Sequence, residues 1–197
     1  MAVRDGRGDV KQTTTGFRGP LMVQSLTSAK SKFLSLGVTY PQKFQDYGRD
    51  LWRKTLDVNL CAPFFLSQKL LPLLKESESA SIINITSLNA ELAFPDNPAY
   101  VSSKAALSGL TRSMALDLGQ LGIRVNSVAP GYIKTKMTGE SYNNPIKRKE
   151  RSNRTVLGRW GTPNDLLGPL LFLASNMSSY VTGHSLFVDG GWKIRGL

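Results

Sequence analysis

Residue types that would define whole classes of protein are scarce in this sequence. The 197 residues include one cysteine, Cys61, which excludes an internal disulfide and argues against structural zinc. The most apolar stretch, residues 60–74, is shorter than the roughly 18 residues of a membrane span, and proline and polar side chains interrupt it. The first residues contain no continuous apolar segment of the kind found in signal peptides. We therefore expect a globular cytoplasmic protein without a metal site.

Acidic residues are also few, with 14 aspartates and glutamates against 25 lysines and arginines and a formal net charge of +11. This charge favours anionic partners and raises the alternative of a basic nucleic-acid-binding protein. No helix-turn-helix, zinc-finger or RNA-binding signature accompanies it, so we do not expect nucleic acid as the partner. The densest basic run is either a solvated surface or a site for an anionic small molecule. It comprises Lys147, Arg148, Lys149, Arg151, Arg154 and Arg159.

The pattern of elements changes near Gly37. Apolar residues at helical spacing predict helices over residues 50–75, 98–120 and 163–175. Short apolar runs predict strands over residues 80–86, 123–128 and 185–188. This alternation predicts an α/β fold with a parallel sheet over residues 37–197. Residues 1–36 are polar at first and predict an irregular segment, with a short helix or strand stub within 21–36.

Four polar residues are placed as a catalytic group would be. Tyr100 and Lys104 are four residues apart on a predicted helix and therefore share a face. An ammonium beside a phenol should lower the pKa of Tyr100 toward the range that general acid/base catalysis needs. Ser87 follows a predicted strand, and Asn59 lies in the preceding helix. The alternative is a packed tyrosine beside a solvated lysine, with Ser87 as an ordinary turn residue and Asn59 as a packed polar side chain.

At these spacings Asn59, Ser87, Tyr100 and Lys104 resemble the catalytic tetrad of the short-chain dehydrogenase/reductase family. Pro-Gly-x-Ile-x-Thr at residues 130–135 and the Thr-Gly…Val-Asp-Gly-Gly ending match the same family. The resemblance covers about residues 37–192. It implies a Rossmann-like fold and hydride transfer between the nicotinamide of NAD or NADP and an alcohol or ketone carbon.

The resemblance also implies a role for each residue. Tyr100 would be the general acid in reduction and the base in oxidation, and Lys104 would hold the nicotinamide ribose and tune Tyr100. Ser87 would hydrogen-bond the substrate oxygen, while Asn59 would shape its helix and hold a water in the proton relay. Further cofactor contacts would come from the nicotinamide side, through Pro130, Gly131, Ile133 and Thr135.

Residues 157–168 and 183–192 are most similar to the branch that acts on sugar acids, such as gluconate 5-dehydrogenases and deoxygluconate dehydrogenases. The substrate would then be a small hydroxy or keto compound that carries a negative charge. The basic run lies where the family places its substrate loop. The family also pairs the helices near residues 56–74 and 107–118 with those of symmetry mates, so we expect a homodimer or homotetramer.

One half of the family pattern is missing from the sequence. No strand is followed by Gly-x-x-x-Gly-x-Gly, and the residue that selects NAD or NADP is absent. We therefore expect an incomplete Rossmann-like sheet without its first βαβ units, and impaired activity. Either the gene product is truncated or mis-assembled, with residues 1–36 replacing the true start, or the chain is a non-catalytic relative that acts as a subunit or interaction partner. We favour the first.

We predict from this that the purified chain binds NADH and NADPH weakly. The pyrophosphate would lose its helix N-terminus, and each charge-assisted hydrogen bond lost weakens binding by about 1.5–3 kcal/mol. Fluorescence titration of the chain with each nucleotide should therefore give no saturation at micromolar concentrations. A micromolar dissociation constant would mean that residues 1–36 supply a phosphate site.

Overall fold

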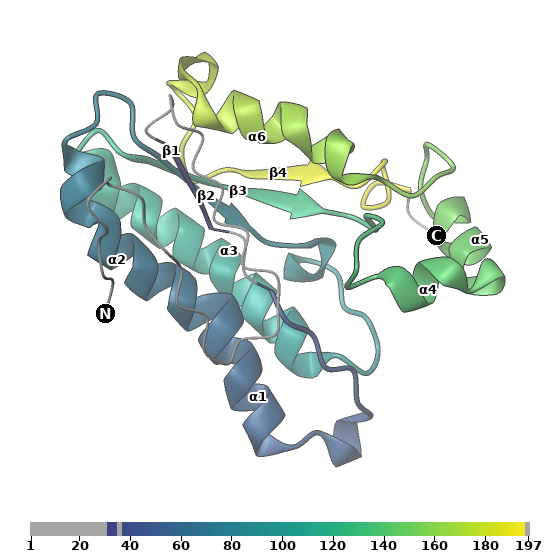
Figure 1. Ribbon diagram of the computed structural model, residues 1–197. Helices are drawn as coiled ribbons and strands as arrows, with labels where there is room; N and C mark the ends of the chain where they lie inside the picture. Colours follow the sequence, from purple (N-terminus) through teal and green to yellow (C-terminus); the bar gives the residue numbers. More distant parts are fainter. Residues whose placement is uncertain (1–30, 35–36, 196–197) are drawn as a thin grey trace, which may run out of the picture.

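The computed structural model describes residues 31–34 and 37–195, and within them the strands form one parallel sheet (Figure 1). Its order is β1-β2-β3-β4, and each strand pairs in parallel with the next. The strands are β1 (Ser31–Leu34), β2 (Ser81–Ile85), β3 (Arg124–Pro130) and β4 (Ser185–Val188). The α/β fold with a parallel sheet is confirmed, and β1, which pairs only with β2 among the described strands, is an edge strand.

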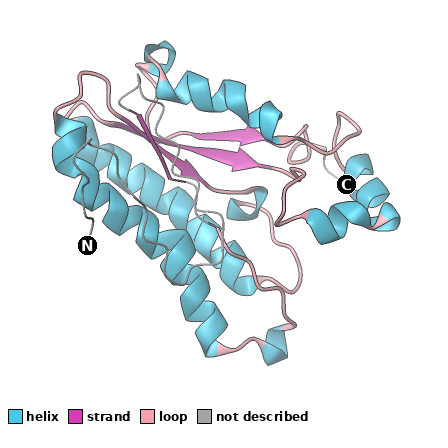
Figure 2. Cartoon of the chain, in the orientation of Figure 1, coloured by secondary structure: helices cyan, strands magenta, loops and turns pink. Residues whose placement is uncertain are grey.

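Helices cover both faces of this sheet (Figures 1 and 2). The helices are α1 (Arg49–Leu56), α2 (Ala62–Lys75), α3 (Pro98–Gly119), α4 (Gly139–Asn143), α5 (Pro145–Asn153) and α6 (Leu167–Ala174). Helices α2 and α3 lie on one face and α6 on the other, while α4 and α5 lie beyond the carboxyl ends of β3 and β4. Short 3₁₀ turns occur at Phe44–Asp46, Leu88–Ala90, Pro163–Leu166 and Asn176–Ser178.

The expected elements are present, with local differences. The predicted helix over 50–75 is continuous, but a π-helical segment, Asp57–Cys61, separates α1 from α2. The helix expected from residue 163 opens as a 3₁₀ turn before α6. We did not expect α4 and α5, because α5 buries none of its residues and so shows no apolar stripe. Residues 1–30 and 35–36 lie outside the described part. Of the segment expected to be irregular, residues 1–36, the structure therefore describes only the four residues of β1.

The core consists of two layers because successive strand residues point to opposite faces. Ile82 of β2 and Val125 of β3 are buried on the side of α2 and α3, together with Met114. Ile83 and its neighbours pack on the other side against α6. Among residues 31–34 and 37–195, no helix is both long enough and apolar enough to cross a membrane.

We predict that Ile83→Ala lowers the free energy of unfolding by about 2–5 kcal/mol, because it removes a fully buried side chain from the middle of the sheet. The matched control is Ile146→Ala on α5, where the side chain is 79% exposed and the change should be small. Urea denaturation measures both. Equal losses in the two variants would contradict the two-layer core.

Candidate active site

Ser87 follows β2 at the carboxyl end of the sheet and caps the turn Leu88–Ala90. Its hydroxyl donates to Oδ1 of Asn89 at 3.1 Å and accepts from the Asn89 amide at 3.2 Å. The Ser87 side chain also lies close enough to Tyr100 to act as a hydrogen-bond partner that lowers the pKa of that phenol. The serine is thus both a strand-end turn residue and a close neighbour of the tyrosine.

Tyr100 and Lys104 lie one turn apart on α3, as expected. The Lys104 side chain is only 2% exposed, and its Nζ donates to the carbonyl oxygen of Ile85 at 2.8 Å. The same Nζ lies 5.7 Å from the centroid of the Tyr100 ring. The ammonium is therefore held between the last residue of β2 and the tyrosine.

Asn59 lies in the π-helical segment and is fully buried. Its Oδ1 accepts from the Val38 amide at 2.8 Å, and its Nδ2 donates to the Val38 carbonyl and to Oγ of Ser103, each at 3.0 Å. Ser103 is the neighbour of Lys104 on α3. Asn59 thus joins the segment that follows β1 to the helix that carries Tyr100 and Lys104, and π-helical turns of this kind occur often at functional sites.

The electrostatics of the pair differ from what we expected. Burial raises the pKa of Tyr100 above its usual value, and this outweighs the hydrogen bond from Ser87, which lowers the pKa; nearby Tyr132 raises it further. Burial also lowers the pKa of Lys104 to about 8. The expected lowering of the Tyr100 pKa by Lys104 was wrong for this structure, because desolvation penalises the phenolate.

The residues expected on the nicotinamide side follow β3 at the same edge of the sheet. Pro130 ends β3, and the Gly131 amide donates to the Val188 carbonyl at 3.0 Å. A side chain on Gly131 would begin 2.8 Å from Cα of Asp189, so only glycine allows β3 and β4 to continue side by side here. Ile133 is buried, whereas Thr135 is exposed, with its amide donating to Oγ1 of Thr138 at 3.0 Å.

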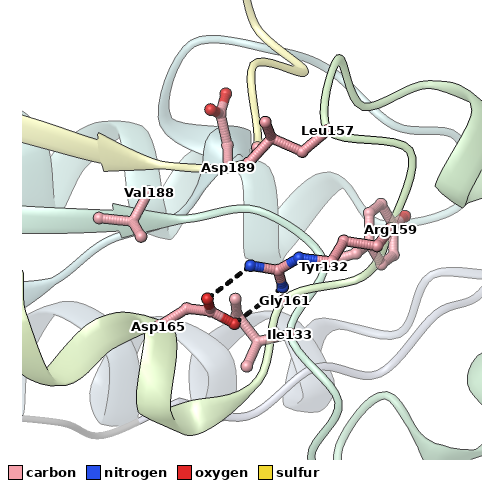
Figure 3. Close-up of a pocket in the computed structure, with 9 residues that line it drawn as sticks. Tyr132, Ile133, Leu157, Arg159, Gly161, Asp165, Val188 and Asp189 are labelled. Carbon is pink, nitrogen blue, oxygen red and sulfur yellow. Dashed lines mark hydrogen bonds and ion pairs between the residues drawn. The ribbon is translucent and has the colours of Figure 1, made fainter.

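A cavity of about 130 Å³ lies beside this loop (Figure 3). The ion pair between Arg159 and Asp165 reaches across it, with Nη2 and Oδ1 2.7 Å apart. The Arg159 guanidinium and the Thr162 amide and hydroxyl hold the pKa of Asp165 well below its usual range. Ser87, Tyr100 and Lys104 do not line this cavity, and its ion pair is already complete. We therefore treat this cavity as part of the scaffold and not as part of the catalytic site around the tetrad.

Aromatic side chains from distant parts of the chain gather beside the tetrad. Tyr132, from the loop after β3, has its ring centroid 5.0 Å from that of Trp192, 5.1 Å from Trp160 and 6.0 Å from Phe94. We call these four residues the aromatic cluster. Phe94 belongs to the segment that joins Ser87 to Tyr100. We did not predict the cluster; the one available signal was an aromatic residue directly after Pro130-Gly131.

The residues after β4 hold α5 in place. The Asp189 carboxylate accepts from the Lys193 amide at 2.8 Å, which folds the chain back into a turn. The Arg195 guanidinium then donates to the carbonyl oxygens of Asn153 and Thr155. Asn153 is the last residue of α5, so this arginine caps the helix that faces the aromatic cluster.

Residues 31–193 match the family model described as Enoyl-(Acyl carrier protein) reductase. The chain belongs to the short-chain dehydrogenase/reductase family. NAD or NADP is the cofactor of this family, as the resemblance implied. In the described structure Lys104 bonds the last residue of β2, Ser87 follows that strand beside Tyr100, and Asn59 is joined to α3 through Ser103. Within the described residues, no group of three histidine, cysteine or acidic side chains could hold a metal ion.

Three relatives show what the chain is similar to. It is 41% identical over 167 residues to a 2-dehydro-3-deoxy-D-gluconate 5-dehydrogenase of Bacillus subtilis, covering 81% of this chain and 63% of that protein. It is 36% identical over 186 residues to an L-rhamnose-1-dehydrogenase of Scheffersomyces stipitis, covering 93% of this chain and 72% of that protein. A gluconate 5-dehydrogenase of Burkholderia cenocepacia in complex with NADP and tartrate superposes with a TM-score of 0.77 at 34% identity, covering 80% and 62% of the two chains.

We predict that Lys104→Met changes how stability depends on pH. A folded-state pKa of about 8, below the usual 10.5, means that above pH 8 the unfolded chain binds more protons at this residue than the folded chain. Lys104 should therefore make stability rise with pH, by up to about 1.4 kcal/mol for each pH unit.

Urea unfolding at a series of pH values between about 8 and 10.5 measures this. The free energy of the unaltered chain minus that of Lys104→Met should increase along the series. The control is Lys149→Met, because Lys149 is an exposed lysine on α5. A difference that stays flat for Lys104→Met would show that the lysine is not desolvated.

Proposed function

We propose that this chain carries the catalytic residues and the nicotinamide-facing half of an NAD(P)-dependent oxidoreductase. The reaction would interconvert a hydroxyl group and a ketone on a sugar acid or a related hydroxy compound in the cytoplasm, with impaired activity in this chain by itself. The observation that carries the proposal is the contact between Ser87 and Tyr100 beside the buried Lys104 ammonium. Once the Ser87 hydroxyl turns away from Asn89 Oδ1, it and the Tyr100 hydroxyl would both donate to one substrate oxygen.

The raised pKa of Tyr100 keeps its hydroxyl protonated at neutral pH, which suits proton donation. In the direction of reduction, the Ser87 and Tyr100 hydroxyls would donate to the carbonyl oxygen of the substrate, and the Tyr100 proton would move to that oxygen. Lys104 would stabilise the phenolate that remains. Asn59, through its hydrogen bonds to Ser103 and Val38, would position α3. It would also hold a water in the relay that returns a proton to Tyr100. When bound, the nicotinamide supplies or accepts the hydride.

The described residues fit the nicotinamide end of such a cofactor. A Cβ at Gly37 would lie 3.7 Å from Lys104 Nζ, an ordinary contact distance, so the segment at Gly37 passes directly beside the ammonium. Lys104 and Tyr100 would hold the ribose, and the loop after β3 would hold the carboxamide and the phosphate side, through Pro130, Gly131, Ile133 and Thr135. We propose residues 37–197 as the catalytic and C-terminal part, and residues 1–36 as an atypical N-terminal segment, of which β1 pairs with β2.

Sugar acids are the proposed substrates because the basic run lies at the same edge of the sheet as Ser87 and the loop after β3. Helix α5 carries most of that run and lies beyond the carboxyl ends of β3 and β4 (Figure 1). The Bacillus relative is named for a gluconate derivative, and the Burkholderia relative is in complex with tartrate. Both ligands are acids, which supports an acidic substrate. The L-rhamnose relative acts on a neutral sugar by its name, so the negative charge of the substrate needs its own test.

We also propose that the chain forms a homodimer or homotetramer through α2 and α3. Both helices expose large apolar side chains: Phe65 and Leu73 on α2 are 58% and 56% exposed, and Leu116 on α3 is 80% exposed. Apolar area of this kind is typical of interfaces between subunits. Light scattering that shows a stable monomer at tens of micromolar would contradict this association.

We predict that Tyr100→Phe abolishes turnover, because losing a general acid lowers the rate by roughly 10²–10⁴-fold. The assay follows NADH or NADPH oxidation with 5-keto-D-gluconate, at millimolar nucleotide. The matched control is Tyr180→Phe, since Tyr180 is fully exposed and should be dispensable. Residual activity in Tyr100→Phe equal to that of the control would refute the assignment. Turnover by the unaltered chain that Tyr100→Phe removes would contradict the alternative of a non-catalytic relative that acts as a subunit or interaction partner.

A further inference from the structure

One guanidinium of the basic run differs from the others. Arg151, on the last turn of α5, has an Nη1 atom that is withdrawn from solvent and finds no hydrogen-bond partner among the described residues. A charged N–H group that loses water without gaining an acceptor is unfavourable, so buried groups of this kind are nearly always partnered. The exception indicates a side chain placed for a ligand.

Aromatic rings fix the plane of this guanidinium. Its Cζ lies 4.4 Å from the centroid of the Tyr132 ring and 5.9 Å from that of Trp160. Trp160 is buried, and its Nε1 donates to the Arg148 carbonyl of α5 at 3.0 Å, which joins the aromatic cluster to the helix. Stacking on rings restrains an arginine without using its hydrogen-bond donors.

The nearest acidic side chain on α5 does not neutralise Arg151. Glu150 faces Arg154, with Oε1 and Nη2 3.9 Å apart and both side chains more than 60% exposed. Among the described residues, Arg151 takes part in none of the ion pairs. Its positive charge therefore remains available to a ligand.

The aromatic cluster also connects Arg151 to the tetrad. Tyr132 lies under the guanidinium and is close enough to Tyr100 to affect its titration. Phe94, which contacts Tyr132, lies between Ser87 and Tyr100 in the chain. A small ligand whose oxygen met Ser87 and Tyr100 would thus extend toward α5.

We infer that Arg151, stacked on Tyr132 and Trp160, binds the carboxylate of the substrate and selects acids over neutral polyols. The inference rests on the proposed function, because it concerns the same site. The planar, forked guanidinium matches two carboxylate oxygens, which a lysine ammonium does not. The rest of the basic run attracts the anion through its general field, and Arg151 is the residue that recognises it.

The test compares two ligands that differ only at one end. D-Gluconate carries a carboxylate where D-sorbitol carries a hydroxymethyl group, and NMR titration of the full chain, with and without NADH, measures the affinity for each. The unaltered chain should bind gluconate about tenfold or more tightly than sorbitol, as a charge-assisted contact predicts. Arg151→Gln should bind the two ligands alike. The matched control, Lys149→Gln, removes the same charge from an exposed position on the same helix and should keep the preference.

Each outcome decides the inference. No preference in the unaltered chain, an unchanged preference in Arg151→Gln, or an equal loss in Lys149→Gln would overturn it. If Arg151→Gln melts early, Arg151→Lys decides: it keeps the charge, so a reduced preference supports recognition by the fork, and a full preference refutes it. Turnover of 5-keto-D-gluconate is scored separately, so an intact preference without turnover counts against the proposed reaction and leaves the inference standing.

Discussion

The arrangement of this molecule depends on one buried cation. An ammonium without water needs acceptors, and Lys104 donates to the carbonyl of Ile85 at the very end of β2. This bond ties the first turns of α3, which carry Tyr100 and Lys104, to the end of the strand that Ser87 follows. The same burial that makes the bond necessary also lowers the pKa of the lysine and raises that of the tyrosine. Structure and chemistry at this edge of the sheet thus have a single physical origin.

Asn59 complements that bond from the opposite side. A buried amide with three hydrogen bonds is favourable only when all its partners stay in place, because each broken bond leaves a polar group unsatisfied. Its partners belong to the segment after β1 and to α3. The polar residues of the tetrad therefore also specify how the helices of one face meet the edge of the sheet. A change in the segment after β1 would alter the position of α3, and a change in α3 would alter that segment.

Local spacing predicted much of this structure, and long-range contacts account for what it did not predict. The three strands after Gly37, the long helices and the grouping of Ser87 with Tyr100 and Lys104 all follow from periods and spacings within short segments. The aromatic cluster could not be predicted, because Phe94, Tyr132, Trp160 and Trp192 meet only in the folded chain. The direction in which the pKa of Tyr100 shifts could not be predicted from the sequence either, since desolvation depends on tertiary burial rather than on the neighbour four residues away.

The bonds from Arg195 to the end of α5 have a practical consequence. Helix α5 has no buried residue of its own, so a contact made more than forty positions later in the chain contributes to keeping it in place. Proteolytic trimming that removes Arg195 would loosen the end of the helix, which would then be held by the Trp160 bond to Arg148 and the stacking of Arg151 on Tyr132. Recombinant versions that differ only in this tail would then share one fold and differ in how they accommodate small molecules beside the sheet.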